Sequence, residues 1–168
     1  MKKFFWEKIK ILPFLLIFCL LLPSCSHGGG DLDLLFSAFD AKVSFRRGQE
    51  LFVADVSVGA LTDSSRSTHL LFSSPECMSG LSITLDGDRK NFALGSVSLG
   101  APPDEYIEIL SLLTPTGAFE LISKNEREIC YSCGDVKWYF DVESKRPTAI
   151  EGSEGIKIEI LEIGKAKK

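Results

Sequence analysis

The stretch DVKWYFDV, residues 135–142, alternates polar and apolar side chains from end to end. Successive side chains of an extended chain point to opposite faces, so the apolar residues would share one face. Those residues are Val136, Trp138, Phe140 and Val142. A strand with one apolar and one polar face is typical of an antiparallel sheet with water on one side. The stretch therefore predicts a half-buried antiparallel strand.

Further stretches show the same alternation and extend the predicted sheet. They are LFVADVSV (51–58), THLLF (68–72), LSITLDGDRKNFAL (81–94) and IKIEI (156–160). Inside the third stretch, Asp86-Gly87 stands between two alternating runs, which is a strong signal for a β-hairpin. SKRP (144–147) predicts a turn before the last stretch. The body of the chain is therefore predicted to be mostly antiparallel sheet.

Three segments favour helices instead. Residues 103–113 begin with a proline and two acidic residues, and their apolar residues recur at i, i+3, i+4 and i+7. A shorter helix is predicted for residues 116–123, and an N-terminal helix for residues 31–41, where an extended lead-in is the alternative. The order of strands and helices predicts an α+β domain: one strongly twisted sheet with helices on one face.

The N-terminus has the profile of a secretory signal. Four lysines lie among the first ten residues, and residues 11–22 are apolar except for one proline. This apolar run is shorter than the roughly 20 residues that a bilayer span needs. The following LPSC (22–25) resembles the lipobox of bacterial lipoproteins, which implies cleavage before Cys25 and acyl chains, such as palmitate, attached at Cys25. The alternatives are an ordinary cleaved signal with an incidental cysteine and an uncleaved anchor.

These observations predict four regions: a signal peptide (1–24), a lipidated cysteine with a glycine-rich tether (25–33), one domain (34–164) and a basic tail (165–168). Without residues 1–24, the remaining 144 residues carry 15 basic and 22 acidic side chains, a net charge of −7. That charge argues against nucleic acid as a partner. The expected location is the cell membrane, with the domain anchored by lipid and facing outside the cytoplasm.

Three cysteines remain in the predicted domain, at positions 77, 130 and 133. Cys130 and Cys133 have the spacing of a redox motif, but they lie in a strand-like stretch, whereas a thioredoxin-like site opens a helix. No second CxxC and no nearby histidine completes a zinc set. Buried or incidental thiols, a structural disulfide of unknown pairing among Cys77, Cys130 and Cys133, and metal or redox chemistry stay open as interpretations.

The sequence offers few residues for catalysis. Its two histidines are His27, in the tether, and His69, at a polar position of a predicted strand. No G-x-S-x-G motif is present, Asp86-Gly87-Asp88 lacks the remainder of an EF-hand loop, and no glycine-rich stretch links a strand to a helix. We therefore expect no enzyme, no cofactor and no metal.

The segment LLFSSPECMSGLSITLDGDRKNFAL (70–94) resembles the lipoprotein carrier superfamily of LolA, LolB and related lipid-binding lipoproteins. Members of that superfamily carry a strand, a Ser-Pro or similar dipeptide, and a short segment that leads to a glycine and the next strand. The resemblance covers roughly residues 34–163. It implies an incomplete antiparallel barrel whose concave face is covered by helices, with an apolar cavity that holds acyl chains of lipoproteins or lipids without catalysis.

Several large apolar residues are candidates to line such a cavity: Phe72, Phe92, Leu110, Leu113, Phe119, Trp138 and Phe140. The alternative is that the same residues fill a solid core. The expected function is that of a membrane-anchored lipoprotein that binds or shields an apolar, acyl-bearing ligand, with a lipid or a lipoprotein acyl chain as its partner. A structural or protein-interaction lipoprotein of the cell envelope is the second hypothesis.

Overall fold

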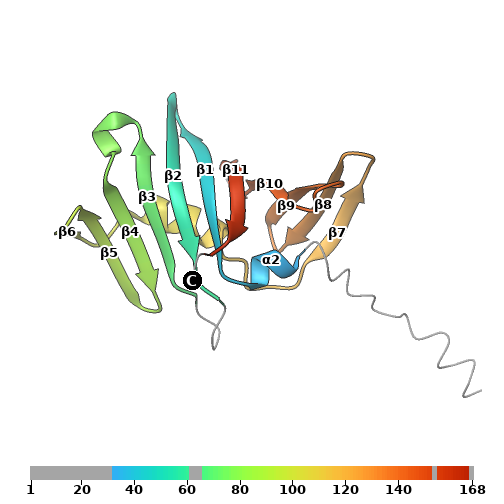
Figure 1. Cartoon of the computed structure of the whole chain (residues 1–168), viewed down its shortest axis with the longest axis horizontal. Coiled ribbons are helices and arrows are strands. Elements are labelled where there is room, and N and C mark those ends of the chain that lie inside the picture. Colours follow the sequence, from blue (N-terminus) through green and yellow to red (C-terminus); the bar gives the residue numbers. More distant parts are fainter. Residues whose placement is uncertain (1–31, 61–65, 153–154, 167–168) are drawn as a thin grey trace, which may run out of the picture.

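The computed structural model describes residues 32–60, 66–152 and 155–166, and these residues form one open antiparallel sheet (Figure 1). The order of its 11 strands across the sheet is β6-β5-β4-β3-β2-β1-β11-β10-β9-β8-β7. The strands are β1 (Phe39–Arg47), β2 (Glu50–Val58), β3 (Thr68–Ser74), β4 (Leu81–Asp86), β5 (Arg89–Leu94), β6 (Val97–Gly100), β7 (Glu120–Lys124), β8 (Glu128–Cys133), β9 (Val136–Asp141), β10 (Pro147–Glu151) and β11 (Lys157–Lys165). Strands β6 and β7 are the two edges of the sheet, so the barrel is not closed.

Two meanders, β1 to β6 and β7 to β11, make the two halves of the sheet, and β1 pairs with β11 where they meet. The predicted alternation is confirmed in both halves. In β2, Phe52, Ala54, Val56 and Val58 are all buried, and in β9 Trp138 and Phe140 are buried while Lys137 is exposed. We call the face that carries these apolar residues the core face. The opposite, mostly polar face is the outer face.

The predicted hairpin at Asp86-Gly87 is confirmed. Asp86 pairs with Arg89 in the register of β4 and β5, so Gly87 and Asp88 form a two-residue loop. Gly87 has a φ of 57°, a conformation that glycine adopts without the steric cost that a Cβ brings. A positive φ at the first loop residue matches a type II′ turn, whose twist suits neighbouring antiparallel strands.

The helix predicted for residues 103–113 is confirmed as α3 (Asp104–Leu112). It lies on the connection from β6 to β7, and these strands are at opposite edges of the sheet. The connection must therefore cross one whole face, and Figure 1 shows α3 behind strands β1 to β3. Its apolar stripe is buried in the same cluster as the core face: Tyr106, Ile109, Leu110 and Leu112, with Leu113 just beyond.

Two helix predictions need correction. Residues 120–123 of the predicted helix 116–123 belong instead to strand β7 (Glu120–Lys124), whose register with β8 shifts between Leu121 and Ser123. The apolar residues Ala118, Leu121 and Ile122 recur at i, i+3 and i+4, which is the spacing of a helix face. The predicted helix 31–41 shortens to α2 (Asp33–Phe36), because Phe39 already begins the buried alternation of β1.

The helical cover is accordingly less than expected. Besides α2, the described residues hold a short 3-10 helix, η1 (Glu76–Met78), and α3 is the longest helix in this part of the chain. The predicted cover of several helices over the concave face is not confirmed. None of the helices in the described ranges is long and apolar enough to cross a membrane. The predicted signal peptide, Cys25 and residues 26–31 lie outside the described residues.

Candidate functional site

The seven predicted cavity residues all belong to one apolar cluster around the core face. Five of them are buried, with exposed fractions of 0–1%: Phe72, Leu110, Leu113, Trp138 and Phe140. Phe92 and Phe119 are half-buried against the same cluster. Ring centroids lie 5.3 Å apart for Phe72 and Tyr106, and 6.2 Å apart for Phe119 and Trp138. Contacts this close make a packed core beneath α3.

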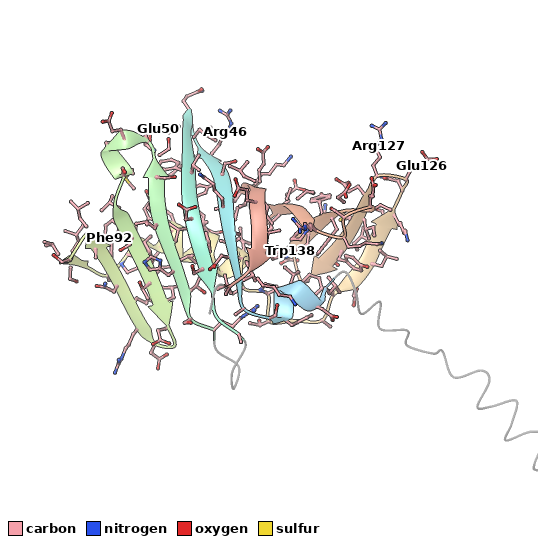
Figure 2. The ribbon with its side chains drawn as sticks, in the orientation of Figure 1. Arg46, Glu50, Phe92, Glu126, Arg127 and Trp138 are labelled. Carbon is pink, nitrogen blue, oxygen red and sulfur yellow. The ribbon has the colours of Figure 1, made fainter. Side chains whose placement is uncertain are left out.

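The core face loses its cover toward the β6 edge. Ile83 pairs with Phe92, and Leu81 pairs with Leu94, which in turn pairs with Val97, so these side chains share the core face. Ile83 is fully buried, whereas Leu94 is 50% exposed and Val97 is 61% exposed. We call Leu81, Phe92, Leu94 and Val97 the β4–β6 patch. Figure 2 labels Phe92 within it, at the end of the sheet away from Trp138.

The same loss of cover occurs at the other edge. Trp138 pairs with Tyr131, and Tyr131 pairs with Leu121 of β7. Trp138 is buried, Tyr131 is half-buried and Leu121 is 58% exposed. The sheet therefore has a packed middle and two apolar ends that α3 does not cover. Sequence reasoning missed Leu94, Val97 and Leu121 as candidate binding residues.

A small cavity of about 140 Å³ lies where the end of α3 meets the β8–β9 hairpin. Its lining includes two groups of residues. The segment around the end of α3 contributes Ser111, Thr114 and Thr116, and the β8–β9 hairpin contributes Cys133, Val136 and Trp138. The Nε1 atom of Trp138 is buried and has no hydrogen-bond acceptor among the described residues. A buried donor without an acceptor is unfavourable, so native structures contain few of them.

Arg66 is a buried cation that sequence reasoning also missed. Its guanidinium donates to the carbonyl oxygens of Gly59 (2.9 Å), Ser37 (2.6 Å) and Leu35, and it lies 5.9 Å from the ring centroid of Phe39. Burial lowers the pKa of Arg66. Because Leu35 and Ser37 flank the end of α2, this side chain fixes the N-terminal segment to the end of β2.

The outer face carries the one histidine of the described domain. His69 of β3 is exposed, and its register neighbours are Ser57 and Thr84, while Ser57 also pairs with Asp40. A catalytic relay needs the histidine between the serine and the acid. Here Ser57 lies between Asp40 and His69. The register therefore places the acid next to the serine and not next to the histidine, where it could support His69 as a base.

The three cysteines are free thiols in the structure. Cys77 is exposed, Cys130 is buried, and Cys133 is intermediate in exposure. Burial raises the pKa of Cys130, which disfavours the thiolate that a nucleophile requires. Among the described residues, no three His, Cys, Asp or Glu side chains are grouped to hold a metal ion.

Tyr139 and Glu151 make a polar contact on the outer face beside Cys130. The Tyr139 hydroxyl donates to the Glu151 carboxylate at 2.7 Å, and this bond, with smaller contributions from burial and charge, raises the pKa of Tyr139 to about 12. An unfolded tyrosine ionises near pH 10. The bond therefore stabilises the fold fully below about pH 10, and its contribution is lost as the pH rises toward 12.

We expect Tyr139→Phe to reduce the loss of stability between pH 10 and 12. Denaturant unfolding of the wild type and the variant at a series of pH values would measure it. The wild type should lose free energy of unfolding more steeply in this interval. Equal slopes would show that Tyr139 ionises with its ordinary pKa in the folded protein.

Comparison with known proteins adds information on the fold. No family model and no curated protein matches the sequence. An uncharacterised conserved protein from Thermus thermophilus aligns with a TM-score of 0.50 and 14% identity, over 82% of this chain and 83% of that chain. MucB aligns with a TM-score of 0.48 and 10% identity over 86% of this chain, which spans 60% of MucB.

The structural neighbours also include LolA superfamily proteins. One of them, from Nitrosomonas europaea, aligns with a TM-score of 0.40 and 10% identity, over 79% of this chain and 88% of that chain. The superfamily that the sequence resembles is thus present among the structural neighbours. At these identities, the likeness concerns the fold alone.

Proposed function

We propose that this protein is a lipid-anchored lipoprotein, facing outside the cytoplasm, that binds an apolar, acyl-bearing ligand without catalysing a reaction. The observation that carries the proposal is the β4–β6 patch, an uncovered continuation of the core face in which Leu94 is 50% exposed and Val97 is 61% exposed. Contiguous exposed apolar surface marks interaction sites in soluble domains. A lipid or the acyl chain of another lipoprotein is the proposed partner.

The free energy of binding at the β4–β6 patch follows from the number of ligand methylene groups that the patch covers. Each buried methylene contributes about 0.8 kcal/mol, so ten fully buried methylenes would contribute about 8 kcal/mol. A patch that is open on one side covers roughly half of the surface of these methylenes, so roughly half of this free energy is gained on binding. That free energy corresponds to a Kd in the high micromolar to millimolar range. Binding of this strength is reversible, as a protein that holds and releases an acyl chain requires.

The anchor in this proposal is Cys25, in the stretch LPSC that resembles a lipobox. Two or three acyl chains hold a protein stably on a membrane, whereas one chain binds only marginally. Residues 26–30, of which three are glycine, supply a flexible link between the acyl chains and the domain.

Mass spectrometry of the full chain, expressed in a bacterial host, tests both parts of the proposal. Under denaturing conditions, we expect the wild-type mass to include a diacylglyceryl group and the loss of residues 1–24, and Cys25→Ser to lack both changes. Under native conditions, with an acyl probe added at millimolar concentration, we expect the probe bound to both forms, since an affinity in the high micromolar to millimolar range does not retain a ligand through purification. Protein that is repeatedly empty and takes up no added acyl probe would contradict ligand binding.

A second candidate function is protein interaction at the β6 edge. Val97-Ser98-Leu99-Gly100 carries no charged residue, and Val97 and Leu99 are both more than half exposed. Charged residues usually protect such edges, and an unprotected edge accepts a strand from a partner. In-cell crosslinking from position 98 that captured one specific protein, with no acyl ligand in the native spectrum, would favour this function.

A further inference from the structure

The β7 end of the sheet carries a second uncovered apolar surface, which the proposed function does not use. Leu121 and Ile122 of β7 are 58% and 56% exposed, and Phe36 of α2 is 43% exposed. The ring centroid of Phe119 lies 6.0 Å from that of Phe36 and 6.4 Å from that of Tyr131. Tyr131 is in turn the register partner of Leu121, so these side chains are connected across α2, β7 and β8. We call Phe36, Phe119, Leu121 and Ile122 the β7 patch.

The β7 patch lies close to the point where the predicted anchor joins the domain. Phe36 is four residues after Leu32, at which the described structure begins, and Cys25 is seven residues before Leu32. Seven residues span at most about 25 Å when fully extended. Acyl chains attached at Cys25 would therefore keep α2 within about 25 Å of the bilayer surface. Strand β6 lies ten strand spacings from β7, roughly 48 Å along the sheet.

The charges around the β7 patch favour an apolar contact with lipid over an ionic one. The charged residues of α2 and β7 are Asp33, Glu120 and Lys124, and all three are exposed. Attraction to anionic headgroups needs a cluster of Lys or Arg, and these two elements do not supply one. Phenylalanine and leucine side chains instead enter the boundary between headgroups and acyl chains, to a depth of about 5–10 Å.

We infer that the β7 patch docks on the bilayer that holds the anchor, with Phe36, Leu121 and Ile122 in its interfacial layer. The inference rests on the lipid-anchored part of the proposed function and adds an orientation to it. Figure 1 shows β6 and β7 at opposite ends of the sheet. With β7 on the bilayer, the β4–β6 patch is turned away from it, so the acyl-bearing ligand arrives from a source other than that bilayer.

Photo-crosslinking of the full chain, purified from a bacterial host and reconstituted in phosphatidylcholine vesicles, tests this orientation. A benzophenone amino acid is placed at position 122 or, as the control, at position 51. Leu51 is 45% exposed, and it follows Glu50, which lies at the opposite end of the strands from α2 (Figure 1 and Figure 2). We expect the chain labelled at position 122 to gain the mass of one phospholipid, and the chain labelled at position 51 to remain without this adduct.

A charge in the β7 patch should prevent docking. Leu121→Asp should lower the phospholipid adduct at position 122 roughly tenfold, because transfer of an ionised carboxylate into apolar surroundings is strongly unfavourable. Leu51→Asp, the matched control, should leave that adduct unchanged, and circular dichroism should show the same β-sheet signal in both variants. The adduct should also persist at high salt, since salt screens ionic attraction but not apolar contact. Loss of the adduct at high salt would contradict apolar docking.

The outcomes separate this inference from the proposed function. Equal phospholipid adducts at positions 122 and 51 would contradict a fixed orientation. A crosslink from position 122 to the acyl group of the same chain would show that the patch holds its own anchor, and a crosslink between two chains would assign it to a second copy; both would overturn docking. A chain without the diacylglyceryl mass would contradict the anchored part of the proposed function. An acylated chain without a phospholipid adduct at position 122 would overturn this inference alone.

Discussion

Replacing Arg66 with alanine is expected to lower the free energy of unfolding by about 3 kcal/mol. The guanidinium donates to three carbonyl oxygens, of Leu35, Ser37 and Gly59, and only 8% of the residue is exposed. The variant leaves these acceptors without a donor, and each buried, unsatisfied polar group costs about 1–3 kcal/mol, reduced where water can enter. Denaturant unfolding of the full chain would measure the difference.

The matched control for this variant is Arg127→Ala. Arg127 is exposed near the tip of the β7–β8 hairpin (Figure 2), so its loss should change stability by less than about 0.5 kcal/mol. Arg66→Lys should fall between the two, because an ammonium cannot reproduce the planar fork of donors. Arg66→Ala and Arg127→Ala chains of equal stability would contradict a structural role for Arg66.

The second large effect is expected from Leu110→Ala, at about 3 kcal/mol of destabilisation. Leu110 is fully buried between α3 and the core face, and Leu→Ala changes at such sites cost about 2–5 kcal/mol through lost transfer energy and the cavity left behind. The prediction tests whether α3 is packed on the core face of the sheet. Thermal or denaturant unfolding would measure it, with loss of β-sheet signal as the readout.

Leu161→Ala is the control of the same chemical type. Leu161 lies on β11 and is 51% exposed, so the same substitution should cost well under about 1 kcal/mol. If Leu110→Ala were as mild as Leu161→Ala, α3 would not be packed on the sheet in solution. The core would then be open along the whole face, and the distinction between a packed middle and uncovered ends would fail.

Helix α3 and strands β2 to β5, β8, β9 and β11 could be predicted from the sequence because their signals are local, whereas β1, β6 and β10 were not predicted separately. The alternation of Trp138 and Phe140 with polar neighbours and the turn at Gly87 depend only on adjacent residues. Strand β7 was missed because the irregularity around Ile122 disrupts the period of two and leaves an apolar spacing that resembles a helix. Local periodicity alone could not separate these two structures.

The candidate site was less predictable because it depends on lateral position within the sheet. Phe72 and Leu94 belong to similar alternating strands, yet Phe72 is 1% exposed and Leu94 is 50% exposed. The difference follows from where the β6–β7 connection places α3, which the alternation does not encode. Arg66 carried no signal either, because its partners are backbone carbonyls that any residue could supply.

The most direct test of the account is the uptake of a fluorescent acyl ester by the full chain in ether-lipid nanodiscs, compared between Val97→Asp and Leu161→Asp. Both residues are more than half exposed, but only Val97 lies in the β4–β6 patch. The account predicts that Val97→Asp loses most of the uptake and that Leu161→Asp retains it. Equal uptake by the two variants would contradict binding at the uncovered end of the sheet.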